Sequence, residues 1–193
     1  MLELEKQREH ISPGLWHFNA GTVKAKMMNP AEARFHFLEA RLHGFNNQKL
    51  SENLNLIEDQ LEITTLEKPL AASDYAVKFG LWAEGGFFTM ICLTIILAGL
   101  IIMKKTRKYY VLILTVLFAA VPLTVNFWVK SWDKSVALTP QQVMDGPSSI
   151  FGSRGELPPG IFLITRKAGE WKEVIYPSRF RGWIKNAGLK ELE

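Results

Sequence analysis

Two long apolar runs dominate the pattern of hydrophobic and polar positions. Residues 85–103 and 109–129 contain no charged side chain over 19 and 21 positions. At a helical rise of 1.5 Å per residue they span roughly 28 and 31 Å, which matches the hydrocarbon core of a bilayer at about 30 Å. The alternative is a pair of buried core helices, but two uninterrupted runs with only five residues between them disfavour it. The pattern predicts a two-helix transmembrane hairpin over residues 85–129.

The connector between the two runs sets the expected orientation. Residues 104–108 contain four basic side chains, Lys104, Lys105, Arg107 and Lys108. Short basic loops stay cytoplasmic, so both termini are expected on the outer face, the periplasm in the case of a bacterial inner membrane. Neither run contains an acid or a base, which argues against ion or proton transport and favours an anchor. The chain opens without a signal peptide, so either the first span itself translocates the preceding residues or the precursor begins upstream of Met1, and we expect the second.

The segment before the hairpin, residues 1–68, has the 3.6-residue period of amphipathic helices. One helix is predicted to start near Pro13, and Asn29 is expected to cap a second that runs from about residue 31 to 43. A third apolar stripe follows the break at Asn46 and contains Leu50, Leu54, Ile57 and Leu61. Residues 69–84 have weak periodicity and are predicted to be a linker into the bilayer.

Small and aromatic residues recur in these helices at a recognisable spacing. Gly21, Ala33, Phe37 and Ala40 resemble the packing skeleton of a tetratricopeptide repeat, in which small residues let antiparallel helices approach closely and the aromatic fills the gap. The resemblance implies a helical domain with a groove for a peptide or a partner helix. A small helical bundle without a ligand is an equally good interpretation of the same residues.

The segment after the hairpin, residues 136–193, changes to short apolar runs separated by turn residues. This pattern predicts a small all-β barrel or sandwich. The order Gly146-Pro147-Ser148, Leu157-Pro158-Pro159-Gly160, Gly169-Glu170-Trp171 and Gly182-Trp183-Ile184 resembles a bacterial SH3 domain, which implies a closed barrel. Trp171, Tyr176 and Trp183 are candidates for a ligand cleft, and packing in the barrel's own core is the alternative, above all for Trp183.

Composition and charge exclude several classes of function. Among 193 residues, 48% are hydrophobic, which rules out disorder throughout, and the single cysteine rules out a disulfide scaffold. The four histidines fall at no ligand spacing and on different predicted faces, so no metal site is expected. A net charge of +4 does not call for nucleic acid. No nucleophile–base pair and no phosphate-binding glycine loop is present, so neither an enzyme nor a cofactor is expected.

The order of the parts is more informative than any one of them. Tetratricopeptide-like helices, a two-span hairpin with a basic loop and an SH3-like domain together resemble the BatE proteins of bacterial aerotolerance operons. The resemblance implies a multi-domain α+β membrane protein that works beside membrane-anchored von Willebrand factor A (VWA)-domain proteins (BatA- and BatB-like), other Bat proteins and, indirectly, a MoxR-type ATPase. The expected function is a scaffold in an aerotolerance or stress-related envelope complex. The alternative is a protein that ties the inner membrane to peptidoglycan through its SH3-like domain.

Overall fold

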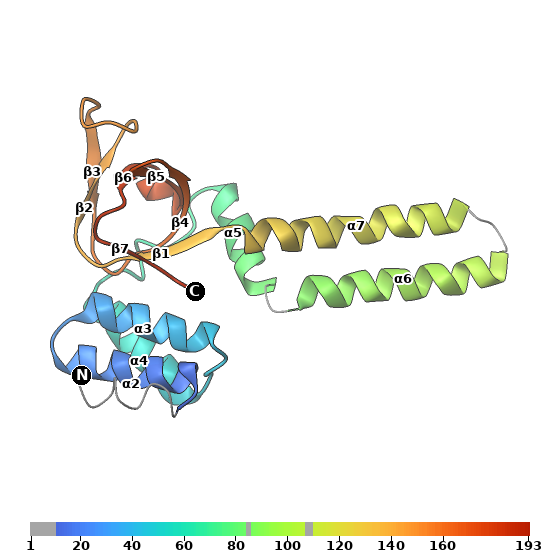
Figure 1. The fold of residues 1–193 in the computed structure, drawn as a ribbon, viewed down its shortest axis with the longest axis horizontal. Helices are drawn as coiled ribbons and strands as arrows, with labels where there is room; N and C mark the ends of the chain where they lie inside the picture. The colour runs from blue at the N-terminus through green and yellow to red at the C-terminus, as the bar shows by residue number, and fades with distance from the viewer. Residues whose placement is uncertain (1–10, 84–85, 107–109) are drawn as a thin grey trace. The chain divides into compact units, whose positions relative to one another are not determined.

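The protein has an α+β architecture, seen in a computed structural model that describes residues 11–83, 86–106 and 110–193 (Figure 1). Contacts divide the chain into two compact units. The first, the head unit, consists of the described residues up to Leu70 together with Asp133–Glu193, and the second, the hairpin unit, of Ala71–Trp132. The head unit therefore contains segments from both sides of the two apolar helices.

The described part of the head unit begins with three helices, α2 (Pro13–Lys26), α3 (Pro30–Leu42) and α4 (Gln48–Gln60). Asn29 Oδ1 accepts a hydrogen bond from the Glu32 N–H at 3.3 Å, and Asn47 Oδ1 accepts one from the Leu50 N–H at 2.8 Å. These caps satisfy backbone donors that lack an intrahelical partner, and Pro13 and Pro30 stand where a missing N–H has no cost. The three helices and the Asn29–Pro30 turn confirm the predictions from periodicity.

The predicted packing skeleton forms the centre of these helices. Ala33, Phe37 and Ala40 share one buried cluster with residues of α4, namely Leu50, Leu54 and Ile57. A Cβ atom added to Gly21 would lie 2.7 Å from the Phe37 ring, so α2 approaches α3 closely only because residue 21 has no side chain.

Seven antiparallel strands form the second half of the head unit. They are β1 (Asp133–Ala137), β2 (Gln141–Met144), β3 (Ser153–Leu157), β4 (Phe162–Ala168), β5 (Trp171–Tyr176), β6 (Gly182–Lys185) and β7 (Leu189–Glu191), with a short 3₁₀ helix, η1 (Ser178–Phe180), between β5 and β6. Their order in the sheet is β3-β2-β6-β5-β4-β1-β7, so β3 and β7 are its edges.

The closed barrel expected from the sequence is wrong, because this sheet is open. Its core is instead completed by residues that follow α4. Ile63 is fully buried among the sheet residues Val143, Leu163, Val174 and Ile184, and Leu61 and Leu66 pack against the same cluster. Apolar surface that a barrel would bury by closing on itself is here covered by the helical half of the unit.

The hairpin unit consists of α5 (Ala72–Ala83), α6 (Phe87–Thr106) and α7 (Tyr110–Lys130). Most of the segment predicted to be a linker, residues 69–84, is thus the helix α5, and Asp74 Oδ2 accepts a hydrogen bond from the Ala71 N–H at its start. Gly80 of α5 packs against Val129 and Trp132, so this helix has a tertiary partner that periodicity alone does not indicate.

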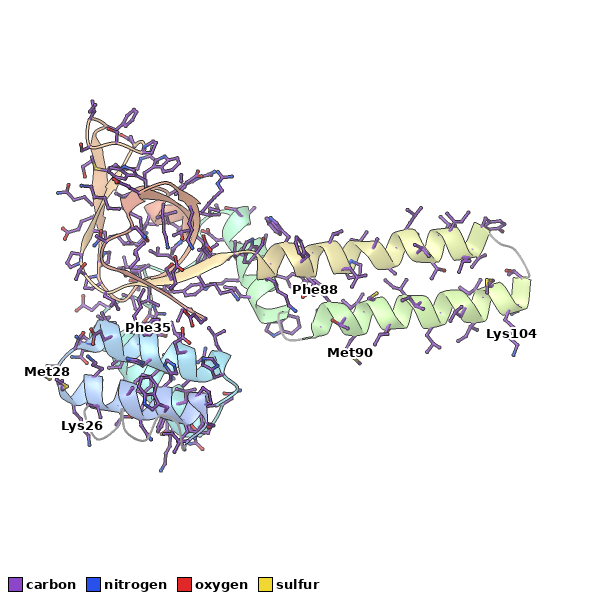
Figure 2. All side chains as sticks on the ribbon, viewed as in Figure 1. Lys26, Met28, Phe35, Phe88, Met90 and Lys104 are labelled. Atoms are coloured by element: carbon purple, nitrogen blue, oxygen red, sulfur yellow. The ribbon has the colours of Figure 1, made fainter. Side chains whose placement is uncertain are left out.

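Helices α6 and α7 are long and apolar enough to cross a bilayer. In the most apolar stretch of each helix only 17% is buried, whereas the core helices of a soluble protein are mostly buried. The two helices meet through small residues, because a Cβ atom added to Gly99 would lie 2.0 Å from Thr115 Oγ1. Figure 2 shows Phe88 between the two helices, where it packs against Val129, whereas the Met90 side chain is exposed.

Candidate functional site

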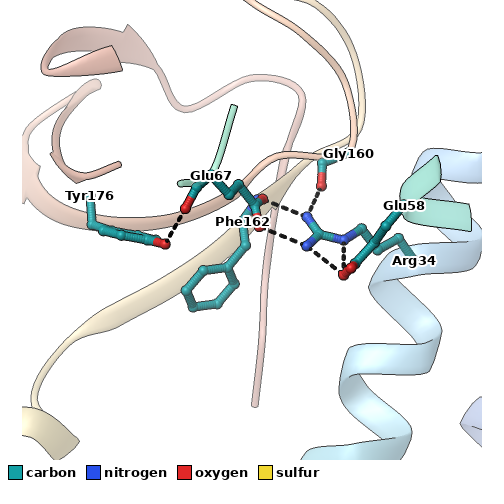
Figure 3. Close-up of polar contacts among 6 residues, drawn as sticks. All are labelled: Arg34, Glu58, Glu67, Gly160, Phe162 and Tyr176. Atoms are coloured by element: carbon teal, nitrogen blue, oxygen red, sulfur yellow. Dashed lines mark hydrogen bonds and ion pairs between the residues drawn. The ribbon is translucent and has the colours of Figure 1, made fainter. Parts of the chain in front are cut away.

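A buried arginine joins the two halves of the head unit (Figure 3). Arg34 lies on α3 with its side chain 4% exposed. Its Nε and Nη2 donate to Glu58 Oε1 at 3.2 and 2.8 Å, and Nη1 and Nη2 donate to the two carboxylate oxygens of Glu67 at 2.7 and 2.8 Å. Nη1 also donates to the carbonyl oxygen of Gly160, just before β4. The guanidinium is thus bound by α4, by the segment after α4 and by the sheet.

Glu67 extends this junction onto the sheet. Its Oε1 accepts the backbone N–H of Phe162 at 2.7 Å, and its carbonyl oxygen accepts the Tyr176 hydroxyl at 3.2 Å. Burial by itself lowers the pKa of Arg34, but the Glu67 and Glu58 carboxylates outweigh it and hold that pKa above its ordinary value. Arg34, Glu58, Glu67 and the groups they bind on the sheet are called the Arg34 junction below.

The three aromatic residues predicted to form a ligand cleft have different environments. Tyr176 is 3% exposed and belongs to the Arg34 junction. Trp171 and Trp183 are half-buried, and the β5–β6 register pairs Trp171 with Lys185 and Glu173 with Trp183. Directly paired residues share a face, as do alternate residues on a strand, so the two tryptophans lie on one face of the sheet. A cleft at this place would use Trp171 and Trp183 without Tyr176.

The other predicted residues belong to the helical core and to the basic connector after α6. Gly21, Ala33, Phe37 and Ala40 lie inside the helical core and offer no open groove of their own. Lys104 and Lys105 are exposed in the last turn of α6, and Figure 2 marks Lys104 there. Arg107 and Lys108, the other two basic residues of the connector, are outside the described residues.

A cavity of about 600 Å³ lies beside α2, α3 and the end of the sheet. Aromatic and titratable side chains line it, among them Trp16, His17, Phe35, His36, Glu39, His43 and Lys190. The Nδ1 atoms of His17 and His36 are 3.1 Å apart, and the rings of His17 and His43 stack with centroids 5.4 Å apart. Three of the four histidines therefore meet at one place, so the prediction that the histidines lie on different faces is wrong for these three.

Burial shifts the pKa of two groups in this cavity. The pKa of His36 falls to about 3, first because the ring is buried and then because Lys190, His17 and Lys24 are close. Burial also raises the pKa of Glu39, although the backbone N–H of Glu193 and the side chain of His43 act in the opposite direction. The cavity thus holds a neutral imidazole and a carboxylate that is costly to keep charged.

The sequence contained a signal for this cluster. His36, Glu39 and His43 are separated by three and four residues, the spacing that places side chains on one face of a helix. His17 is on a different helix, and only the close packing of α2 on α3 brings it to the same cavity.

No family model, no curated protein and no solved structure matches this chain. The head unit itself offers two features on which a functional hypothesis can stand. The Arg34 junction links residues before the hairpin to residues after it, and the histidine cavity brings together groups with ligand chemistry.

Proposed function

We propose that this protein is a membrane-anchored scaffold whose head unit docks partner proteins. The observation that carries the proposal is the Arg34 junction. It ties residues that precede the hairpin to residues that follow it, through hydrogen bonds from Arg34 to Gly160 and from Phe162 to Glu67. In this proposal the segments before and after the hairpin form one composite head rather than two independent modules, and the hairpin serves as the anchor.

This arrangement agrees with a hairpin that crosses the membrane twice. Segments that hydrogen-bond to each other must lie on the same side of a bilayer, and an even number of spans returns the chain to the side on which it began. The basic residues Lys104 and Lys105 at the turn favour a cytoplasmic connector. The proposed head is therefore periplasmic, held at a bacterial inner membrane with both termini outside.

Two features of the head suit protein docking. The edge strand β3 exposes four of its five residues, and an unpaired strand edge is a template for an added strand from a partner. The helical half has the tetratricopeptide-like skeleton, and the sheet has the SH3-like order of motifs. By resemblance to BatE proteins, the partners would be VWA-domain proteins of a Bat/MoxR-type envelope complex that acts in aerotolerance or stress.

Thiol labelling tests the topology. Arg179 in the head and Thr106 at the end of α6 are both exposed, and the single native cysteine, Cys92, is buried between the apolar helices. In intact spheroplasts, an Arg179→Cys protein should react with a membrane-impermeant maleimide and a Thr106→Cys protein should react only after permeabilisation. Labelling in the reverse order would refute a periplasmic head.

Cross-linking in cells tests the scaffold function. The protein is cross-linked, extracted in detergent and purified, and VWA-domain proteins should co-purify with the wild type and with Arg154→Met, which alters an exposed ion pair. They should be reduced with Arg34→Met, which disrupts the composite head. Absence of VWA-domain proteins from the wild-type sample would contradict the assignment to a Bat-type complex.

The same-face pair of Trp171 and Trp183 favours a second candidate, a head that binds peptidoglycan. Half-buried tryptophans offer large rigid contact area to a sugar or peptide ligand. If this is the function, the purified protein should sediment with isolated murein sacculi, and Trp171→Ala should abolish sedimentation. Trp82→Ala, which changes an exposed tryptophan of the hairpin unit, is the matched control.

A further inference from the structure

Two histidines and a glutamate converge at the wall of the histidine cavity. His17 comes from α2, Glu39 lies on α3, and His43 caps the C-terminal end of α3. One ligand atom from each of the three side chains lies within 4.8 Å of the others. The carboxylate of Glu39 is 3% exposed, and its Oε2 is 3.3 Å from His43 Nε2.

We propose that His17, Glu39 and His43 bind a divalent transition-metal ion of the Zn²⁺ class. Imidazole nitrogen and carboxylate oxygen are donors that suit this class, and two histidines with one glutamate form a known type of three-ligand zinc site. Bond lengths of about 2.1 Å would place the ligand atoms of a tetrahedral ion about 3.4 Å apart. The donors lie within 4.8 Å of one another, so binding would shorten the longest of these separations by about 1.4 Å.

The neighbours of the three side chains hold them in suitable orientations. The backbone N–H of Glu193 donates to Glu39 Oε1 at 2.9 Å, which leaves Oε2 directed at His43. The 3.1 Å approach of the His17 and His36 Nδ1 atoms requires one of them to donate and the other to accept. This hydrogen bond helps to hold the His17 ring in place. A hydrogen bond to the second ring nitrogen is the usual support of a metal-binding histidine.

An ordinary ion pair explains only part of the cluster. Glu39 and His43 are four residues apart, a spacing at which such pairs are common in helices. That pair does not include His17, whose ring stacks on the ring of His43 with centroids 5.4 Å apart. A cation bound by the three side chains would engage His17 together with that pair.

The cations around the cavity have partners of their own. Lys24 forms an ion pair with Glu32, and the Lys190 ammonium lies 4.3 Å from the centroid of the Phe35 ring. Three protein ligands leave at least one coordination position, which would open toward the cavity of about 600 Å³. Water or a ligand from outside the chain would fill that position.

Metal titration of the full chain tests this proposal. The protein is prepared in detergent without a polyhistidine tag, treated with a chelator and titrated with Zn²⁺ in a calorimeter and with Co²⁺ in a spectrophotometer. We expect one ion per chain and visible Co²⁺ absorption. His17→Ala and His43→Ala should each weaken Zn²⁺ binding on the order of 100-fold or more, since even supporting neighbours of a ligand contribute 10- to 100-fold. Glu52→Gln, which changes an exposed carboxylate of α4, should bind like the wild type.

A measurement on the wild type covers the case in which a variant fails to fold. Zn²⁺ should protect His17 and His43 from modification by diethyl pyrocarbonate, as mapped by mass spectrometry. His43 is 35% exposed, so its modification in the metal-free protein is expected to be detectable. Failure of Zn²⁺ to saturate the wild type, wild-type affinity in both histidine variants, or absence of protection at His43 would each overturn the proposal.

Discussion

Replacing Arg34 by methionine should destabilise the head unit far more than replacing any exposed arginine. Methionine keeps the apolar stem of the side chain but removes all five hydrogen bonds of the guanidinium. It also leaves the carboxylates of Glu58 and Glu67 next to each other without their shared counterion. The Glu67 carboxylate would then be a partly buried charge that still accepts the Phe162 N–H.

The magnitude follows from the burial of the groups. Removing one partner from a buried ion pair costs about 3–5 kcal/mol, because the other charge remains desolvated. The Glu58 and Glu67 side chains are 28% and 17% exposed, so water can solvate part of their charge. We therefore expect a loss of stability at the lower end of this range, about 3 kcal/mol. A unit of this size loses roughly 3–4 °C of Tm per kcal/mol, which corresponds to a drop of about 10 °C. Arg34→Lys should recover little, since an ammonium cannot replace a planar fork that binds two carboxylates.

Tryptophan fluorescence can report on the head unit alone. Trp82, Trp128 and Trp132 belong to the hairpin unit, so a background with phenylalanine at these positions leaves Trp16, Trp171 and Trp183 as reporters. Unfolding by urea in detergent then gives the free energy of the head for each variant. Arg154→Met, which removes an ion pair with Asp145 from a side chain 59% exposed, should change it by less than about 1 kcal/mol. If Arg34→Met changed it by no more than Arg154→Met does, the junction would not hold the two segments together.

Three further changes address other parts of the chain. Gly99→Leu should force α6 away from Thr115 and weaken disulfide cross-linking of cysteine pairs placed across the two helices, whereas Thr94→Leu, at an exposed position of α6, should not. Phe37→Ala should cost the head about 3–5 kcal/mol in urea unfolding, against a small effect of Phe151→Ala at a 49% exposed ring. Glu191→Gln should cost roughly 1–2 kcal/mol at pH 7, because Glu191 is bonded at 2.7 Å to the buried ammonium of Lys172. Hydrogen bonds from Lys172 and Lys167 hold the pKa of Glu191 below 4.5, so the stability it contributes is present above that pH and is lost as the pH falls through the lowered pKa. The difference between wild type and Glu191→Gln should shrink on acidification, and a difference that grew instead would contradict this pairing.

Local signals in the sequence predict the helices correctly, but they do not predict whether the sheet closes into a barrel. Asn29 caps a helix where the pattern predicts a cap, and Asn47 caps the helix that follows the predicted break, since a cap depends on a few adjacent residues. The open sheet depends on Ile63, which is seventy residues before the first strand and completes a core that a barrel would otherwise close. Hydrophobic periodicity cannot show that a residue packs against a segment so distant in the chain.

Helix α3 shows why the hydrophobic pattern did not predict the two candidate sites. Ala33, Phe37 and Ala40 form the apolar face that the sequence predicted, and they face α2 and α4. Arg34, His36 and Glu39 are also buried, at 3%, 5% and 2% exposed. Polar residues between the apolar ones usually indicate a solvated face, so the pattern did not predict that Arg34 is buried.

Those polar residues have separate tasks in the folded head. Arg34 binds the sheet and the segment after α4, while His36 and Glu39 face the histidine cavity with His43. A buried helix can keep charged residues only where each is paired. The burial of a polar side chain therefore says more about whether it has a structural or functional partner than its residue type does. The same helix thus carries both the contact that unites the two outer segments and two of the three proposed metal ligands. Because a ligand that binds only the folded state stabilises it, Zn²⁺ bound at His17, Glu39 and His43 should raise the urea midpoint of the head in the wild type but not in His43→Ala.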